Sequence, residues 1–352
     1  MFVVGGVLIY LAIKKDYEPM LLLPIGFGAI LANIPMSSAI GNGGFLTLLY
    51  NAGIKTELFP VLIFIAVGAM IDFGPLLQQP AMIFFGAAAQ LGIFLTTILG
   101  ASLGFSLKEA ASIGIIGAAD GPTSIYVANL FAPQLLGPIS VAAYSYMALV
   151  PVIQPPVITA LTTPEERRMR MDLNLVRVSR RARILFPIMV TVVAGILAPM
   201  SVALVGSLMF GNLIRECGVL DKLSRAAQND LADLVTLVLG ITIGSTMTAD
   251  RFLTPATLMI LGMGLIAFVL DTAGGVLFAK LLNIFLKHKI NPMVGAAGIS
   301  AFPMSARVIH KLAQREDPQN FILMQSVGAN VAGQIGSIVA GGVILSLVGP
   351  MA

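Results

Sequence analysis

The sequence predicts an all-α, polytopic membrane protein. Of its 352 residues, 57% are hydrophobic and only 11% are charged, whereas soluble domains average about 25% charged residues. The apolar residues form long runs, such as residues 255–286, and not the short alternating segments of a membrane β-barrel. Both observations favour helices that cross a bilayer several times.

A basic, polar stretch at residues 162–183 divides the chain into two halves. It holds seven arginines, and the positive-inside rule places such a stretch in the cytoplasm. We therefore expect a first transmembrane repeat at 1–161, a basic cytoplasmic linker at 162–183 and a second transmembrane repeat at 184–352. The apolar segments lie at about 2–13, 19–35, 58–77, 80–104, 110–132, 136–161, 184–199, 200–217, 230–248, 255–286, 291–314 and 318–349.

Four short motifs of the first half recur in the same order in the second, which predicts an internal duplication. Gly- and Pro-interrupted segments at corresponding places in two halves are typical of transporters with a site at the bilayer midplane. The two repeats are expected to be inverted if each contains an odd number of spans. The pairs are GFGAILANI (26–34) and VGSLMFGNLI (205–214), NAGI (51–54) and ECGV (216–219), IAVGAMIDF (65–73) and ITIGSTMTADRF (241–252), and GAADGPTS (117–124) and GAAGISAFPMS (295–305).

Asp120 lies inside an otherwise apolar stretch, GAADGPTSIY (117–126). An acid at membrane depth costs at least about 2.5–3.5 kcal/mol, and the glycine and proline that follow Asp120 interrupt the helix. Broken backbone is tolerated at that depth only inside protein or beside a water-filled cavity. The carboxylate, the free carbonyls beside it and the hydroxyls that follow predict a site for a hard cation. The alternative, compatible with the first, is that Asp120 caps the helix that begins directly after it.

The second broken element is NPMVGAAGISAFPMSARVIHKL (291–312). Ser300 lies in its break, and a proline restarts the helix on which Arg307, His310 and Lys311 share a face. For His310 and Lys311 we favour a helix end whose cationic tips snorkel toward water. Arg307 lies closer to the break, so it either snorkels as well or faces the cavity, where its planar guanidinium would suit a carboxylate.

Several other classes of function are not supported. Cys217 is the single cysteine, so neither an internal disulfide nor a cysteine-based metal site is expected. The two histidines, His288 and His310, suggest no nucleophilic triad. The basic linker lacks interleaved aromatic residues, so nucleic acid is not an expected partner. Asp271, in the membrane segment FVLDTAGG, is interpreted as a helix-packing or cavity residue.

Several long motifs closely resemble the β subunit of the biotin-dependent, sodium-translocating decarboxylases, which act on oxaloacetate, methylmalonyl-CoA or glutaconyl-CoA. The resemblance covers essentially the whole chain. The motifs are GAADGPTSIY, AAYSYMALVPVIQPPV (142–157), INPMVGAAGISAFPMSARV (290–308) and GANVAGQIGS (328–337), together with LLLPIGFG, VGAMIDFGPLL and the loop around ERRMRM. Some members of the family carry a long polar insertion before the VGAMIDF segment, which this chain lacks.

The resemblance implies a sodium pump in which this subunit decarboxylates carboxybiotin, consumes a proton and exports sodium. Arg307 would bind the carboxybiotin carboxylate, and either Tyr146 or Ser300 would supply the proton. Asp120 and Asn291 would offer oxygens to the sodium ion. The implied residues are Asp120, Asn291, Gly295, Ser300 and Asn330 for sodium binding, and Arg307, Tyr146 and Ser300 for catalysis.

The same resemblance implies a complex in the cytoplasmic (inner) membrane of a bacterium or archaeon. Carboxybiotin would arrive on a separate biotin carrier protein, because this chain has no AMKM-like attachment site. A carboxyltransferase α subunit, a small γ-type membrane subunit, further copies of this chain and membrane lipid are the other expected partners. Two alternatives stay open at this point: a sodium-coupled transporter of a small carboxylate or a sodium/proton antiporter, and a structural subunit that binds no ion.

Overall fold

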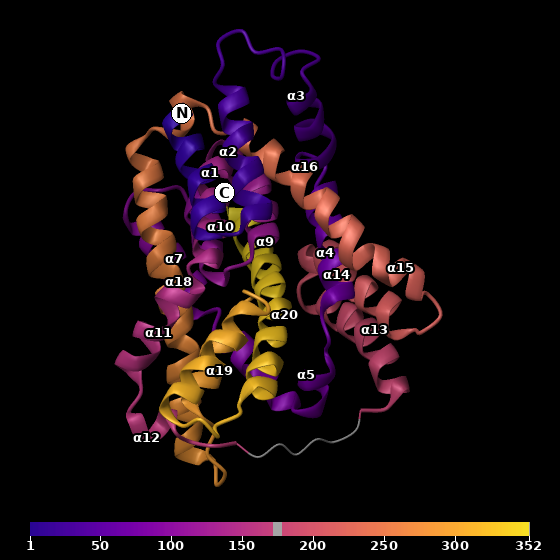
Figure 1. The fold of residues 1–352 in the computed structure, drawn as a ribbon, viewed down its shortest axis with the longest axis vertical. Helices are drawn as coiled ribbons and strands as arrows, with labels where there is room; N and C mark the ends of the chain where they lie inside the picture. The colour runs from indigo at the N-terminus through magenta and orange to yellow at the C-terminus, as the bar shows by residue number, and fades with distance from the viewer. Residues whose placement is uncertain (172–177, 352) are drawn as a thin grey trace.

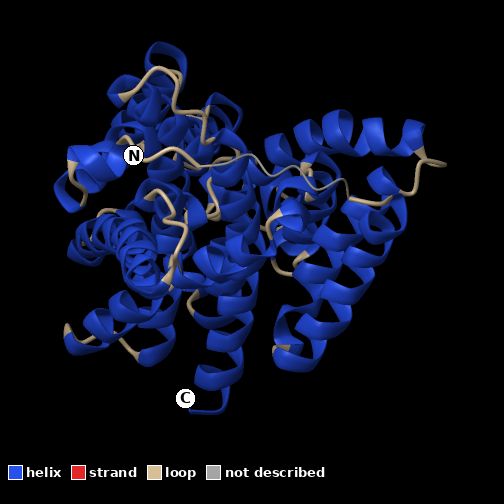
Figure 2. Cartoon of the chain, turned by 90° about the horizontal axis from the view of Figure 1, so that it is seen from below, coloured by secondary structure: helices blue, strands red, loops and turns tan. Residues whose placement is uncertain are grey.

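A computed structural model describes residues 1–171 and 178–351; residues 172–177, inside the predicted linker, lie outside the described residues. Within the described ranges the chain forms helices, turns and loops and no strand, as Figure 2 shows. The predicted all-α fold is confirmed.

The helices of the first half, in chain order, are α1 (Phe2–Lys15), α2 (Pro19–Ala32), α3 (Phe45–Leu49), η1 (Tyr50–Ile54), α4 (Leu58–Met70), α5 (Gly74–Gln78), η2 (Pro80–Met82), α6 (Ile83–Ala88), α7 (Leu91–Ser102), α8 (Leu107–Gly114), η3 (Ile115–Ala118), α9 (Gly121–Phe131), η4 (Pro133–Leu135), α10 (Leu136–Ala148), α11 (Val150–Leu161) and α12 (Pro164–Arg167). Those of the second half are α13 (Arg180–Leu197), η5 (Pro199–Ser201), α14 (Val202–Glu216), α15 (Asp221–Ala226), η6 (Ala227–Leu231), α16 (Ala232–Ser245), α17 (Ala249–Phe252), α18 (Pro255–Phe285), η7 (Pro292–Gly298), α19 (Met304–Glu316), α20 (Leu323–Val348) and η8 (Gly349–Met351).

Four helical runs of the described residues are long and apolar enough to cross a membrane, or up to six if each of two bent pairs is one span. The bent pairs turn by 64° and 69° at breaks of a few residues. In the second pair, α11 carries a proline at its start, where a missing N–H interrupts the helical ladder. The four runs are Pro80–Ser102, Asp221–Ser245, Pro255–Phe285 and Leu323–Val348, and the bent pairs are Phe45–Ile54 with Leu58–Met70 and Pro133–Ala148 with Val150–Leu161.

The helices gather into two groups, which Figure 1 displays side by side. One group is built around α18 and α20, with η7 packed against both of them. The other contains α13, α14 and α15 and is joined to the first through α4 and α16. The described ends of the linker lie at the lower end of the molecule in Figure 1, and α3 lies near the upper end.

Helices of one half pack closely on helices of the other through glycines. A Cβ on Gly68 of α4 would lie 1.8 Å from the Leu208 carbonyl oxygen of α14, and one on Gly244 of α16 would lie 2.1 Å from the Ile25 carbonyl oxygen of α2. Neither position has room for a larger residue, and such close backbone contact is typical of helix pairs in membranes.

Two asparagines reinforce these same helix pairs. Asn212 of α14 donates to the Ile71 carbonyl at 3.0 Å, and Asn33, after α2, donates to the Met247 carbonyl at 2.8 Å. Each bond joins the end of a helix from one half to the end of a helix from the other. A duplicated chain would produce such paired contacts, but the duplication, its orientation and the predicted domain boundaries stay predictions.

Candidate functional site

The first broken element is the chain reversal between η3 and α9. The 3₁₀ turn η3 ends at Ala118, and Ala119 adopts a left-handed conformation with φ 52°. Asp120 then becomes the N-cap of α9, and its Oδ1 accepts a hydrogen bond from the Thr123 backbone N–H at 3.2 Å. The predicted capping role of Asp120 is therefore confirmed, and it leaves Oδ2 available for other partners.

The Asp120 carboxylate is buried and surrounded by hydroxyl donors. Asp120 is only 4% exposed. Oδ2 accepts one hydrogen bond from the Thr123 hydroxyl and one from the Ser337 hydroxyl of α20, both at 2.7 Å. Among the described residues no lysine, arginine or histidine forms an ion pair with Asp120. The side-chain partners of this carboxylate among the described residues are therefore hydroxyl groups and not basic side chains.

The second broken element crosses the first at Ser300. The Ser300 backbone N–H donates to the Ala118 carbonyl at 3.0 Å, directly beside the turn that carries Asp120. The Ser300 hydroxyl donates to the Gly333 carbonyl of α20 at 2.9 Å, and the Gln334 side chain donates to the Ser300 carbonyl. These bonds fix both breaks against one stretch of α20.

α20 supplies a polar stripe to both breaks. Asn330 donates to the Ile299 carbonyl at 2.6 Å, and its Oδ1 has no hydrogen-bond partner among the described residues. Gln334 and Ser337 lie one and two turns further along the same helix. Of these three residues only Asn330 was among the predicted site residues, although positions four and seven residues further along share its helix face and so identify Gln334 and Ser337.

A small cavity of about 120 Å³ lies where these elements meet. The two breaks supply most of its wall, and α4, α10 and α20 complete it. Asp120 and Ser300 both line it, so a carboxyl group and a hydroxyl-bearing residue face the same cavity. Its lining consists of Phe64, Val67, Met70, Ala119, Asp120, Gly121, Pro122, Met147, Ser300, Phe302, Pro303 and Gln334.

Asn291 and Gly295 lie toward the other end of η7. Asn291 caps η7, accepting from the Met293 N–H at 3.0 Å, and its side-chain amide donates to the Arg167 and Met169 carbonyls at 3.1 and 2.8 Å. Since a 3₁₀ helix rises about 2.0 Å per residue, the seven residues of η7 place Asn291 about 14 Å from the break. The contacts of Asn291 thus join η7 to the linker, and none of them reaches Asp120.

Gly295 lets η7 approach α18. A Cβ on Gly295 would lie 2.0 Å from the Gly275 carbonyl oxygen, and a Cβ on Gly275 would lie 2.0 Å from the Gly295 carbonyl oxygen. In this structure the predicted site glycine allows η7 to pack closely on α18, and it is not among the residues that line the cavity.

Tyr146 and Arg307 occupy different surroundings. Tyr146 of α10 is buried, and its hydroxyl donates to the Leu261 carbonyl of α18. Arg307 is exposed in the first turns of α19, one turn after Pro303, which lines the cavity. Arg307 thus stands beside the break, accessible from outside, while the Tyr146 hydroxyl already has an acceptor.

Asp271 is a second buried acid, in the middle of α18. It is fully buried, and its Oδ1 accepts a hydrogen bond from the Ile93 N–H at 3.2 Å, in the first turn of α7. Unpaired N–H groups at a helix start favour a nearby carboxylate. Asp271 thus packs α18 against α7, because its carboxylate accepts a hydrogen bond at the start of α7, where the helix begins again after the break that follows α6.

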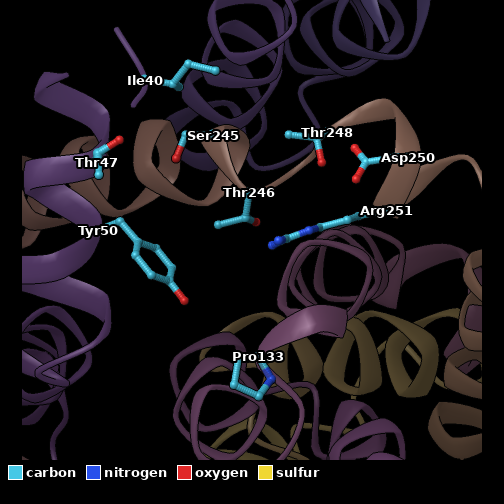
Figure 3. Close-up of a pocket in the computed structure, with 9 residues that line it drawn as sticks. All are labelled: Ile40, Thr47, Tyr50, Pro133, Ser245, Thr246, Thr248, Asp250 and Arg251. Carbon is cyan, nitrogen blue, oxygen red and sulfur yellow. The ribbon is translucent and has the colours of Figure 1, made fainter. Parts of the chain in front are cut away.

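A larger, polar hollow lies among α3, η1 and the α16–α17 connection, and Figure 3 shows it. Its volume is about 360 Å³. Tyr50 and the Arg251 guanidinium point into it, and the Asp250 carboxylate faces Thr248. This hollow does not include Asp120 or Ser300, and five of its nine lining residues lie in the recurring motif at 241–252.

The sequence profile of one protein family matches residues 1–348, and its description is Na+-transporting oxaloacetate decarboxylase beta subunit. The chain belongs to this family. Membership confirms the expectation of a decarboxylase subunit that forms the membrane part of a sodium pump, and it does not favour the alternative of a separate secondary transporter.

Curated relatives agree with this assignment. The chain is 51% identical to glutaconyl-CoA decarboxylase subunit beta of Acidaminococcus fermentans, over 99% of this chain and 92% of that protein. It is 49% identical to methylmalonyl-CoA decarboxylase subunit beta of Propionigenium modestum, over 99% of this chain and 94% of that protein. It is 45% identical to the oxaloacetate decarboxylase beta chain of Haemophilus ducreyi, over 100% of this chain and 95% of that protein.

The aligned lengths carry one further fact. The alignment covers 349 residues with the Acidaminococcus relative and 414 with the Haemophilus relative. The latter protein therefore contains segments that have no counterpart in this beta subunit, in keeping with the polar insertion that some members of the family carry and this chain lacks.

Proposed function

We propose that this beta subunit binds the transported sodium ion at Asp120 and couples its export to decarboxylation of carboxybiotin at the neighbouring break. The observation that carries the proposal is the meeting of the two breaks and α20 at a buried carboxylate. Asp120 accepts hydrogen bonds from the Thr123 and Ser337 hydroxyls, and no basic side chain among the described residues forms an ion pair with it. A buried, unpaired carboxylate is costly, and a bound cation offsets that cost.

The oxygen atoms near Asp120 suit a hard monovalent cation. Carboxylate, hydroxyl and backbone carbonyl oxygens are the ligands that hard cations prefer. Asp120, Thr123 and Ser337 supply the first two kinds, and the break at Ala119 supplies backbone carbonyls outside regular helix. Asn330, whose Oδ1 has no described partner, lies on the same helix as Ser337 and is proposed as a further oxygen ligand.

The chemistry proposed for the break is the loss of CO2 from the N-carboxylate of biotin. The C–N bond breaks, its electron pair stays on the biotin ureido nitrogen, and that nitrogen takes one proton. Arg307 is proposed to hold the carboxylate through its two parallel N–H groups before the bond breaks. Its exposure allows a carrier-bound substrate to reach it.

The proton is proposed to come through a hydroxyl, from Ser300 or from Tyr146. Ser300 lines the cavity with Asp120, so a cation there would act on it directly. Each hydroxyl must first release an acceptor, Ser300 the Gly333 carbonyl and Tyr146 the Leu261 carbonyl. Asn291 and Gly295 are also proposed as sodium-site residues, as the family resemblance implies; their described contacts are with the linker carbonyls for Asn291 and with α18 for Gly295.

The proposed complex follows from the chemistry that this chain lacks. Biotin is proposed to arrive on a carrier protein charged by a carboxyltransferase subunit, with a small γ-type membrane subunit and further copies of this chain in the same bacterial or archaeal inner membrane. The linker is the expected docking side, because Arg167 and Arg170 there form ion pairs with Glu316, the last residue of the helix that carries Arg307, and with Asp317, which follows it.

The decisive experiment is Asp120→Asn in the whole reconstituted complex. Asparagine caps a helix about as well as aspartate, so the turn is kept while the charge is removed. We expect loss of sodium-dependent decarboxylation and of sodium uptake into vesicles, with normal assembly. The matched control is Asp271→Asn, a buried helix-capping acid outside the cavity, which is expected to stay active. Full activity of Asp120→Asn with an unchanged sodium requirement would refute the proposal.

A further inference from the structure

Tyr144 lies against the Asp120 turn, although it belongs to a different helix. It is 2% exposed in α10. A Cβ on Gly121 would lie 2.1 Å from Tyr144 Cε1 and 2.7 Å from its hydroxyl oxygen. The phenol therefore occupies the space that any other residue at position 121 would need. Glycine directly after Asp120 is thus a requirement of this contact.

The Tyr144 hydroxyl is buried and has no hydrogen-bond partner among the described residues. A buried tyrosine hydroxyl normally finds a partner, and leaving it without one costs about 1–3 kcal/mol. Tyr146, two residues on, follows the normal rule, since it donates to Leu261. The Tyr144 ring contacts Gly121, the residue directly after Asp120, so the phenol lies beside the turn that carries the carboxylate.

The hydroxyl is not needed as another donor to Asp120. That carboxylate already accepts three hydrogen bonds, from the Thr123 N–H, the Thr123 hydroxyl and the Ser337 hydroxyl. What Tyr144 adds beside the turn is an oxygen whose lone pairs have no described donor. A cation held by the carboxylate would satisfy that oxygen.

We infer that the Tyr144 hydroxyl oxygen is a neutral ligand of the cation bound at Asp120. This inference rests on the proposed function and extends its site to α10. The ring is rigid and packed against Gly121, so the oxygen is held in position before the ion arrives, which lowers the entropic cost of binding. Tyr144 sets the affinity for sodium and takes no part in breaking the C–N bond.

The test is Tyr144→Phe in the whole complex, with the sodium concentration varied. Phenylalanine keeps the ring against Gly121 and removes only the hydroxyl. We expect the half-saturating sodium concentration to rise by about tenfold, in line with the loss of one ligand bond, with turnover at saturating sodium within about twofold. The matched control is Tyr126→Phe in α9, also buried, whose hydroxyl faces the Met200 carbonyl at 3.5 Å; its sodium requirement should not change.

A second readout, independent of turnover, is the rise in melting temperature of the purified complex on adding sodium. Tyr144→Phe should need about tenfold more sodium for the same rise. An unchanged sodium requirement in both assays, or slower turnover with unchanged sodium binding, would overturn the inference. If Asp120→Asn is inactive while Tyr144→Phe behaves as wild type, only the role of Tyr144 fails. If Asp120→Asn keeps its sodium requirement, the proposed function itself fails.

Discussion

Removing the Ser337 hydroxyl tests the buried carboxylate without touching it. Ser337→Ala deletes one oxygen atom from α20 and leaves Asp120 in place. The Ser337 Oγ lies 2.7 Å from Asp120 Oδ2, the usual length of a hydroxyl hydrogen bond. Both residues are buried, so water does not readily replace the lost donor.

The size of the effect follows from that geometry. A hydrogen bond to a charged group contributes about 1.5–3 kcal/mol. Without Ser337 the ionised form of Asp120 is less stable, so the neutral, protonated form competes better with sodium. If the whole bond is lost, the half-saturating sodium concentration rises by about 10- to 150-fold. Thr123 still donates two bonds to Asp120, so we expect a value near the lower end.

The assay is sodium-dependent decarboxylation by the reconstituted complex at two pH values. The increase in sodium requirement should be larger at the lower pH, because more protons compete for the carboxyl group. Ser346→Ala is the matched control, since the Ser346 hydroxyl bonds the Gly342 carbonyl of its own helix at 2.9 Å. Its sodium requirement should change by less than about twofold. Equal sodium curves for Ser337→Ala and wild type at both pH values would contradict a role for Asp120 in ion binding.

Three further predictions concern the surrounding residues. Tyr146→Phe should slow decarboxylation by about 10²–10⁴-fold if this hydroxyl is the positioned acid; unchanged turnover would leave Ser300 as the donor. Arg307→Lys keeps the charge but loses the bidentate fork, so turnover of free carboxybiotin should largely disappear while protection by sodium against proteolysis persists, and retained turnover would remove Arg307 from the site. Gly295→Ala places a Cβ 2.0 Å from a carbonyl oxygen and should lower the yield and melting temperature of the complex, whereas Gly262→Ala, with open space around it, should not; equal stability of the two would show that η7 is not tightly packed on α18.

The sequence predicted the all-helical membrane fold and the position of both breaks. Composition decides the first, because a chain with 11% charged residues cannot cover a soluble surface. Glycine, proline and N-capping side chains decide the second, because they act on backbone within a few residues of themselves. Asp120 capping α9 is such a local event, and so is Asn291 capping η7.

Tertiary structure alone decided which side chains meet at the cavity. Ser337 reaches Asp120 across 217 positions of sequence, and no local rule selects that pair. Asn291, expected beside the ion, bonds the linker, because η7 carries it about 14 Å from the break. Tyr144 and Tyr146 show most clearly why the sequence alone does not decide which side chains meet. Residues two apart on a helix point about 200° away from each other, so the rotation of α10 against its neighbours decides which phenol lies beside Gly121 and which bonds α18.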